Sequence, residues 1–132
     1  KEGLMPDFWR PMTDNDYGNG LNKRAAVWKN AGNNVEVKSI ESSEHDDGSV
    51  LLNVLMDILD DSGSKLAEET ISYTSFASGD MLVDVDFRKS SPELPELPRM
   101  GLQMQLGAEY DRLEWYGRGP HHNYADRKHP LS

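Results

Sequence analysis

The 132-residue sequence contains no cysteine, and this absence excludes several kinds of chemistry at once. Disulfide bonds, thiolate catalysis and cysteine-ligated zinc all need a sulfur atom that the chain does not have. Basic residues are also scarce, since 14 Lys and Arg stand against 23 Asp and Glu and give a formal net charge of −9. This balance disfavours nucleic acid and anionic membrane as partners, because both are bound through clustered positive charge.

Long apolar runs are missing as well, and no segment approaches the ~20 residues that a membrane-spanning helix needs. Hydrophobic residues make up 36% and charged residues 28% of the chain. This composition is typical of a soluble globular protein, and the length fits one domain. A chain without thiols suits oxidising and reducing spaces alike, so the compartment stays open between the cytoplasm and the bacterial periplasm.

The first third of the chain predicts irregular structure followed by one helix. Proline and glycine interrupt residues 3–20, which favours loops over regular elements. Leu21, Ala25 and Trp28 then recur at helical spacing, and Gly32 follows as a stop signal, so we expect a short helix over residues 21–31. Asn19 or Asn22 is expected to cap its start.

After Gly32 the apolar residues alternate, which is the period of a β-strand. Strands are predicted over residues 35–44, 50–59, 66–77 and 81–88, with turns at Asp47-Gly48, around Gly63 and at Ser78-Gly79. Residues 90–98 hold three prolines and predict a stiff loop, after which alternation resumes over 100–106. A last strand is expected to begin at Leu113 and Trp115 and to end at Gly117. Short strands joined by turns predict a mainly β fold, an antiparallel sheet of sandwich type with one short N-terminal helix.

The strand over residues 50–59 is apolar on both of its faces. Such a strand is expected to be covered on both sides. One helix and some loops are all the cover that the rest of the sequence predicts. We therefore expect apolar sheet surface and unpaired strand edges, and with them self-association of the chain.

Two carboxylates and an amide follow one another in the segment Arg10-Pro11-Met12-Thr13-Asp14-Asn15-Asp16-Tyr17-Gly18. Such a run can bind a cation or a sugar hydroxyl, but it lacks the glycine and glutamate of an EF-hand loop. The alternative, which we favour, is that Asp14, Asn15 and Asp16 accept hydrogen bonds from backbone amides and cap the predicted helix.

A second polar segment runs from Trp115 to Arg127 and includes adjacent histidines. His121, His122 and His129 are candidate metal ligands beside Asp126. However, no helical i, i+4 histidine pair exists, and adjacent residues of an extended chain point to opposite sides. We favour a fixed turn in which Asp126 and Arg127 anchor loops, and we assign no metal ligand.

Hydrolysis of a glycosidic bond needs two carboxyl groups held a few ångströms apart. The sequence predicts no such pair, since Asp84 and Asp86 lie on the polar face of a strand and Glu68 and Glu69 face alternate sides. We therefore assign no catalytic residue. Three tryptophans are candidate stacking surfaces for sugars, and of these Trp28 is expected in the core. The candidate carbohydrate-binding residues are Trp9, Asp14, Asp16, Trp115 and Arg127.

At the two polar segments, residues 10–18 and 115–127, the sequence resembles a known family. Phe8-Trp9-Arg10-Pro11-Met12-Thr13-Asp14-Asn15-Asp16-Tyr17-Gly18, followed by Trp28-Lys29-Asn30-Ala31-Gly32, resembles the start of the small C-terminal domain of family 2 glycoside hydrolase β-galactosidases. Residues 100–106, Trp115-Tyr116-Gly117-Arg118-Gly119-Pro120 and Asn123-Tyr124-x-Asp126-Arg127 resemble a later block of that domain. The blocks occur in the same order and span nearly the whole chain. One departure is His122, where the family usually has a glutamate.

The resemblance implies a galactose-mutarotase-like supersandwich, of which residues 1–132 form a single partial domain. It implies a parent enzyme that hydrolyses terminal β-D-galactosides with retention, using two glutamates and a divalent metal such as Mg²⁺ on a barrel domain outside this chain. The chain itself is then non-catalytic and holds no cofactor. Its partners are the remaining domains of that enzyme, and the β-galactoside through them. A stand-alone carbohydrate-binding module and a purely structural assembly domain are the alternatives.

Overall fold

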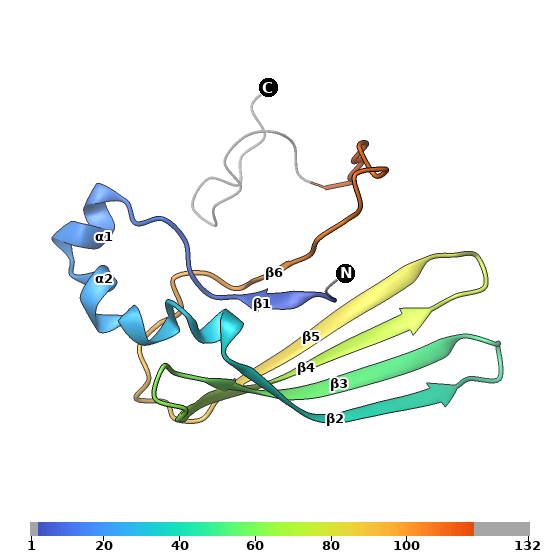
Figure 1. Cartoon of the computed structure of the whole chain (residues 1–132), viewed down its shortest axis with the longest axis horizontal. Coiled ribbons are helices and arrows are strands. Elements are labelled where there is room, and N and C mark those ends of the chain that lie inside the picture. Colours follow the sequence, from blue (N-terminus) through green and yellow to red (C-terminus); the bar gives the residue numbers. More distant parts are fainter. Residues whose placement is uncertain (1–2, 118–132) are drawn as a thin grey trace.

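The computed structural model describes residues 3–117 and shows two antiparallel sheets joined by short helices (Figure 1). The larger sheet is a meander of four strands in the order β2-β3-β4-β5. These strands are β2 (Val35–Glu44), β3 (Val50–Leu59), β4 (Lys65–Ser75) and β5 (Met81–Lys89). The smaller sheet pairs β1 (Met5–Asp7) with β6 (Gly101–Gln103). The mainly antiparallel β fold predicted from the sequence is therefore confirmed, in an arrangement consistent with a β-sandwich.

The turns of the meander explain why its strands were predicted so closely. Gly48, Gly63 and Gly79 have φ angles of 77°, 83° and 92°, a backbone region that only glycine adopts without strain. Aspartate carboxylates brace two of these turns. Asp47 accepts from the Ser49 amide at 2.9 Å and Asp60 from the Ser62 amide at 2.8 Å. Turn chemistry and period-two patterning thus agree along residues 35–89.

The helical region corrects the prediction of a single helix over residues 21–31. It consists of α1 (Asp14–Gly18), α2 (Leu21–Arg24) and two 3-10 turns, η1 (Ala26–Trp28) and η2 (Ala31–Asn33). Gly20, with a φ of 74°, is the N-cap of α2, so neither Asn19 nor Asn22 holds that position. Tertiary packing is the reason for the break, because the tight turns bury Leu21, Ala25, Trp28 and Ala31 together in one core.

In the smaller sheet, one strand was not predicted and the other was predicted too long. β1 lies in the segment predicted to be irregular, and β6 is shorter than the predicted strand over 100–106. A three-residue strand has no readable alternation, and β6 can only be as long as its partner β1. The last predicted strand is also wrong within the described chain, since residues 111–117 form no strand and Leu113 and Trp115 are 74% and 73% exposed.

The core lies between one face of the larger sheet and a covering layer. We use the term covering layer for β1, Phe8 and the helical segment from α2 to η2. Phe8 stacks at a tilt on Phe87 of β5, with ring centroids 5.3 Å apart, and on Trp28 at 5.9 Å. Met56 and Ile58 of β3 and Ile71 of β4 complete this core. Within residues 3–117 no helix has the length and apolar character needed to cross a lipid bilayer.

The covering layer reaches only part of the sheet. In Figure 1 the β2–β3 and β4–β5 hairpins extend well beyond the helices and β1. Val50 and Met81, at these hairpin ends, are 45% and 58% exposed, whereas Ile58 at the other end of β3 is fully buried. The predicted cover on both faces of β3 is thus incomplete in the part of the protein that the structure describes.

Candidate functional site

The polar run at residues 10–18 folds into a hydrogen-bonded loop around one carboxylate. Thr13 is the N-cap of α1 and forms a capping box with Asp16. The Arg10 guanidinium donates to both oxygens of Asp16, at 2.6 and 3.0 Å, and the Thr13 amide donates to Asp16 Oδ2 at 2.8 Å. Arg10 Nε also donates to the Pro98 carbonyl at 3.1 Å. Asp16 therefore accepts a hydrogen bond from a backbone amide and caps a helix, as predicted, but the helix is α1 and not the one predicted over residues 21–31.

The electrostatics of this loop are those of a satisfied structural carboxylate. Hydrogen bonds from Arg10 hold the pKa of Asp16 well below its ordinary value, and the Thr13 amide lowers the pKa further. Asp16 is 7% exposed, so little of it faces solvent. Its oxygens accept bonds from within the chain, and these bonds fix the start of α1 against the loop at Pro98.

The other candidate carbohydrate-binding residues are distributed over the molecule. Trp9 is half-buried and packs against the core, and its amide donates to Asp7 Oδ1 at 3.3 Å. Asp14 is exposed in the first turn of α1, and Trp115 is 73% exposed. Arg127, like His121, His122, Asp126 and His129, lies outside the described residues. The structure brings Asp14 and Asp16 together on one short helix, and no hydrogen bond or ion pair within residues 3–117 joins them to Trp9 or Trp115.

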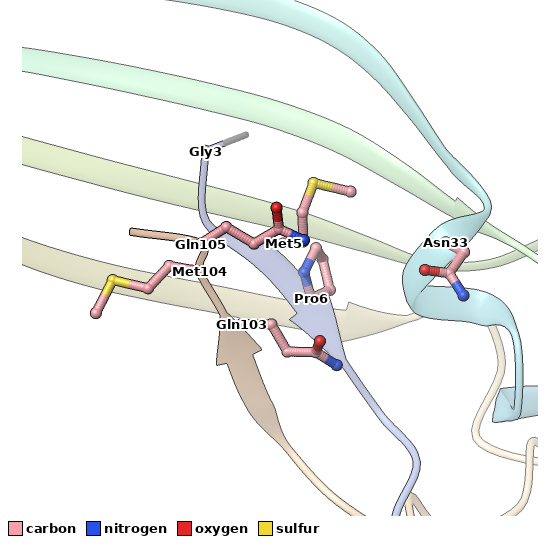
Figure 2. Close-up of a pocket in the computed structure, with 7 residues that line it drawn as sticks. All are labelled: Gly3, Met5, Pro6, Asn33, Gln103, Met104 and Gln105. Carbon is pink, nitrogen blue, oxygen red and sulfur yellow. The ribbon is translucent and has the colours of Figure 1, made fainter. Parts of the chain in front are cut away.

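An open pocket that the sequence did not predict lies at the β1–β6 sheet (Figure 2). We call it the β1–β6 pocket. It encloses about 180 Å³ and is lined by Gly3, Met5, Pro6, Asn33, Gln103, Met104 and Gln105. Its polar groups are carboxamides, which donate and accept hydrogen bonds without charge. The pocket exists because residues from the two ends of the described chain pair with each other, so sequence patterning alone could not predict it.

The acidic residues considered for catalysis do not converge. Glu68 and Glu69 point to opposite faces of β4, as predicted, with Glu68 facing Arg88 and Glu69 facing Phe87 in the strand register. Glu68 accepts from Lys65 at 3.1 Å, and Asp86 accepts from Arg88 at 2.9 Å. Among residues 3–117 no group of three or more Asp, Glu or His side chains is placed to hold a metal ion.

Glu69, which was weighed from the sequence as a catalytic acid and rejected, has an unusual environment in the structure. It is 1% exposed, and neither of its oxygens has a hydrogen-bond partner in the described chain. Burial raises its pKa from 4.5 to about 7. The alternation of β4 did place Glu69 on the apolar face with Ile71, and this placement was the one signal available in the sequence.

Comparison with known proteins gives a consistent result. The family model described as "Beta galactosidase small chain" matches residues 1–130. A β-galactosidase of Priestia megaterium is 39% identical over 96% of this chain, and one of Halalkalibacterium halodurans is 36% identical over 93%. A β-galactosidase of Lactobacillus delbrueckii subsp. bulgaricus is 34% identical over 91%. The chain spans only 12%, 12% and 11% of these three relatives.

The fold and the comparisons together define a small antiparallel β domain of a kind found within larger enzymes. Its most recognisable motif, at residues 10–18, ties its own loops together through Asp16. The chain belongs to the β-galactosidase small chain family.

Proposed function

We propose that this chain is an accessory, non-catalytic domain of a retaining family 2 β-galactosidase and corresponds to the first part of that enzyme's small C-terminal domain. The observation that carries the proposal is the match over residues 1–130 to a family whose members are about eight times longer than the chain. The parent enzyme hydrolyses terminal β-D-galactosides. The chain contributes a scaffold to it and supplies neither acid nor nucleophile.

The described residues support a division of labour between this chain and the rest of the enzyme. Retaining hydrolysis needs two carboxyl groups about 5 Å apart. Glu68 and Glu69 lie on opposite faces of β4, and the carboxylates that do meet, Asp57 and Glu68, are both paired with Lys65. We therefore assign the catalytic glutamates and the divalent metal, Mg²⁺, to a barrel domain on other polypeptide.

The remaining domains of the enzyme are the proposed partners of the exposed sheet end. We define this sheet end by the four exposed apolar residues Ile40, Val50, Met81 and Val85, which are 36–63% exposed. The strand register places them on the face of the sheet that carries the core. In the isolated chain this face has no other domain to cover it, so we infer that two copies associate through it.

The test of the proposed function is a pair of activity measurements. The purified chain is expected to turn over no chromogenic β-galactoside, because the two carboxylates that meet within residues 3–117, Asp57 and Glu68, are both bound to the Lys65 ammonium. Added to a β-galactosidase polypeptide from which the small-chain segment is removed, it is expected to increase activity. Turnover by the chain alone, free of contaminating enzyme, would refute the non-catalytic assignment.

A second candidate function is a stand-alone carbohydrate-binding module. The carboxamides of the β1–β6 pocket and the exposed Trp115 favour it, because amides bond sugar hydroxyls and indole faces stack on sugar rings. Titration with galactose or lactose, followed by NMR, separates the two functions. Saturable shifts at Gln103 and Gln105 would favour the module, and unchanged spectra favour the accessory domain.

Self-association has its own measurement. Light scattering is expected to show dimers or larger species of the wild-type chain at high concentration. Replacement of two exposed residues, Ile40→Asp with Met81→Asp, is expected to give monomers, since two charges would be buried in the contact. A wild-type chain that stays monomeric at every concentration would contradict the inference.

A further inference from the structure

One carboxyl group of the core has no electrostatic compensation in the described chain. Glu69 occupies the middle of β4, directly opposite Met56 of β3 and Phe87 of β5 in the sheet register. The neighbouring positions on the same face of β4, Ala67 and Ile71, are both 0% exposed. Glu69 therefore lies in an apolar row beneath the covering layer, 1% exposed, with both oxygens unbonded among residues 3–117.

The other buried polar side chains of the described chain all have partners. Asp7 is paired with Arg99 at 3.1 Å, Asp16 with Arg10, and Ser49 with Asp47. An unpaired buried carboxylate costs several kcal/mol in general, and proteins avoid this cost by keeping such a group protonated. Glu69 is thus the exception that calls for a physical explanation.

The charged and titratable groups on the surrounding elements are engaged elsewhere or exposed. From β1, Asp7 bonds Arg99, and from β5, Lys89 donates to the Leu94 carbonyl at 3.0 Å. From the helical segment, Arg24 bonds Glu96, and the side chains of Lys23 and Lys29 are exposed. β6 and the core-facing positions of β3 carry no charge. On β4 itself, burial raises the pKa of Tyr73, a hydrogen bond with the Leu4 backbone lowers it, and the Glu69 carboxylate raises it. On β2 the only ionisable residue on this face is Glu44, at the far end of the strand.

We propose that Glu69 is a pH-sensitive contact between the sheet and its covering layer, closed when the carboxyl is protonated and opened when it ionises. The proton leaves to solvent, and the carboxylate is hydrated by water that enters as β1 and the helical segment move away from the sheet. Burial raises the pKa of Glu69 to about 7, which puts the transition near neutral pH. This inference does not depend on the proposed function.

The covering layer, and not the sheet, is the part expected to move. β4 is held by antiparallel ladders to β3 and β5 along its whole length. The covering layer has a shorter ladder, the three register pairs of β1 with β6, and is otherwise held by side-chain packing and by side-chain bonds: Trp28 to the Pro95 carbonyl at 3.1 Å, Asp7 to Arg99, Arg24 to Glu96 and Asn30 to Asp61. Opening at the element with fewer hydrogen bonds costs less, so local unfolding starts there.

The sign of the pH effect follows from the raised pKa. The open state titrates near the ordinary 4.5 and the closed state near 7. The opening constant is therefore expected to rise about tenfold for each pH unit between these two values and to level off above them. Closure is strongest below about pH 4.5 and weakens as the pH rises from there to about 7.

The experiment is an NMR titration of the 132-residue chain from about pH 4 to about pH 9. The carboxyl ¹³C signal of Glu69 is expected to titrate near pH 7. Amide exchange, corrected for its intrinsic pH dependence, is expected to lose protection in β1 and η1 over the same range while β3 and β4 keep theirs. The Trp28 indole N–H should report the same transition.

Two variants and a matched control complete the test. Glu69→Gln and Glu69→Met are expected to abolish the pH dependence of protection in β1, and Met keeps the proposal testable if Gln fails to fold. The control is Glu68→Gln, at the neighbouring position on the opposite face of β4, and this variant is expected to keep the pH dependence of protection in β1. A wild-type Glu69 carboxyl that titrates near 4.5, or an undiminished pH dependence in both Glu69 variants, would overturn the proposal.

Discussion

A single added methyl group at Gly32 tests how closely β1 packs on the helical segment. A Cβ built at Gly32, in η2, would lie 2.3 Å from the Pro6 carbonyl oxygen and 3.1 Å from the Pro6 carbonyl carbon. Ordinary contacts of a Cβ begin near 3.4 Å. Backbone atoms of β1 or of η2 must therefore move apart by about 1 Å, because the obstacle is main chain and cannot rotate away.

The expected cost of Gly32→Ala is that of overpacking, about 1–3 kcal/mol. For a domain of this length that cost corresponds to a fall in Tm of about 4–12 °C. The displacement is expected to appear first in β1, since only three register pairs hold β1 to β6. Urea and thermal denaturation measure the cost, and amide exchange at Met5 and Asp7 locates it.

Gly18→Ala is the matched control for this substitution. Gly18 ends α1, and a Cβ built there has nothing within 4 Å. Alanine is the better helix former, so stability is expected to stay the same or to rise slightly. If Gly32→Ala were as stable as the wild type with β1 protection intact, the close approach of η2 to Pro6 would be refuted.

Three further substitutions probe the core and the buried carboxylates. Trp28→Leu is expected to lower the free energy of unfolding by about 3 kcal/mol, because it leaves space in a fully buried site and removes the hydrogen bond to the Pro95 carbonyl. Urea denaturation measures this loss, and a loss below about 1 kcal/mol would contradict the prediction. Asp16→Asn is expected to be less stable than the wild type at neutral pH. Because Arg10 holds the pKa of folded Asp16 below its ordinary 3.8, this difference in unfolding free energy should disappear as the pH falls through that pKa, and a difference independent of pH would count against the ion pair. Glu69→Met is expected to be more stable to unfolding than the wild type by up to about 3 kcal/mol above neutral pH, and equally stable below pH 4.5, because the wild type must hold or hydrate a carboxylate whose pKa is raised to about 7. Equal stability of the two proteins at about pH 8 would contradict the burial of that carboxyl group.

Much of the larger sheet could be read from residues 35–89 alone. β2 and β3 begin and end where alternation predicted, because each strand is bounded by a turn that needs glycine at a positive φ. Asp47 and Asp60 add side-chain bonds to the turn backbone, so local chemistry and strand pairing specify the same register. Family membership was also legible, because the run at residues 8–18 and the tryptophan at residue 28 occur in the expected order.

The helical segment shows where reading from the sequence stops. Its apolar spacing fits one helix, yet Ala25 and Asn30 interrupt it, and the pieces turn so that Trp28 and Ala31 reach the same core. Helix propensity over so few residues is worth less than the burial of a tryptophan. The candidate site was also predicted only in its local part. Asp16 was predicted as a helix cap, whereas its bonds to Arg10 and the bond from Arg10 to the Pro98 carbonyl were not predicted.

The sequence by itself determined the meander, its turns and the family, because these depend on residues that are near neighbours along the chain. The tertiary structure alone decided the β1–β6 pairing, the pocket beside it and the isolation of Glu69 under the covering layer. Each of these requires segments distant in sequence to meet. The energy of such a meeting comes from apolar area and hydrogen bonds that no single segment carries.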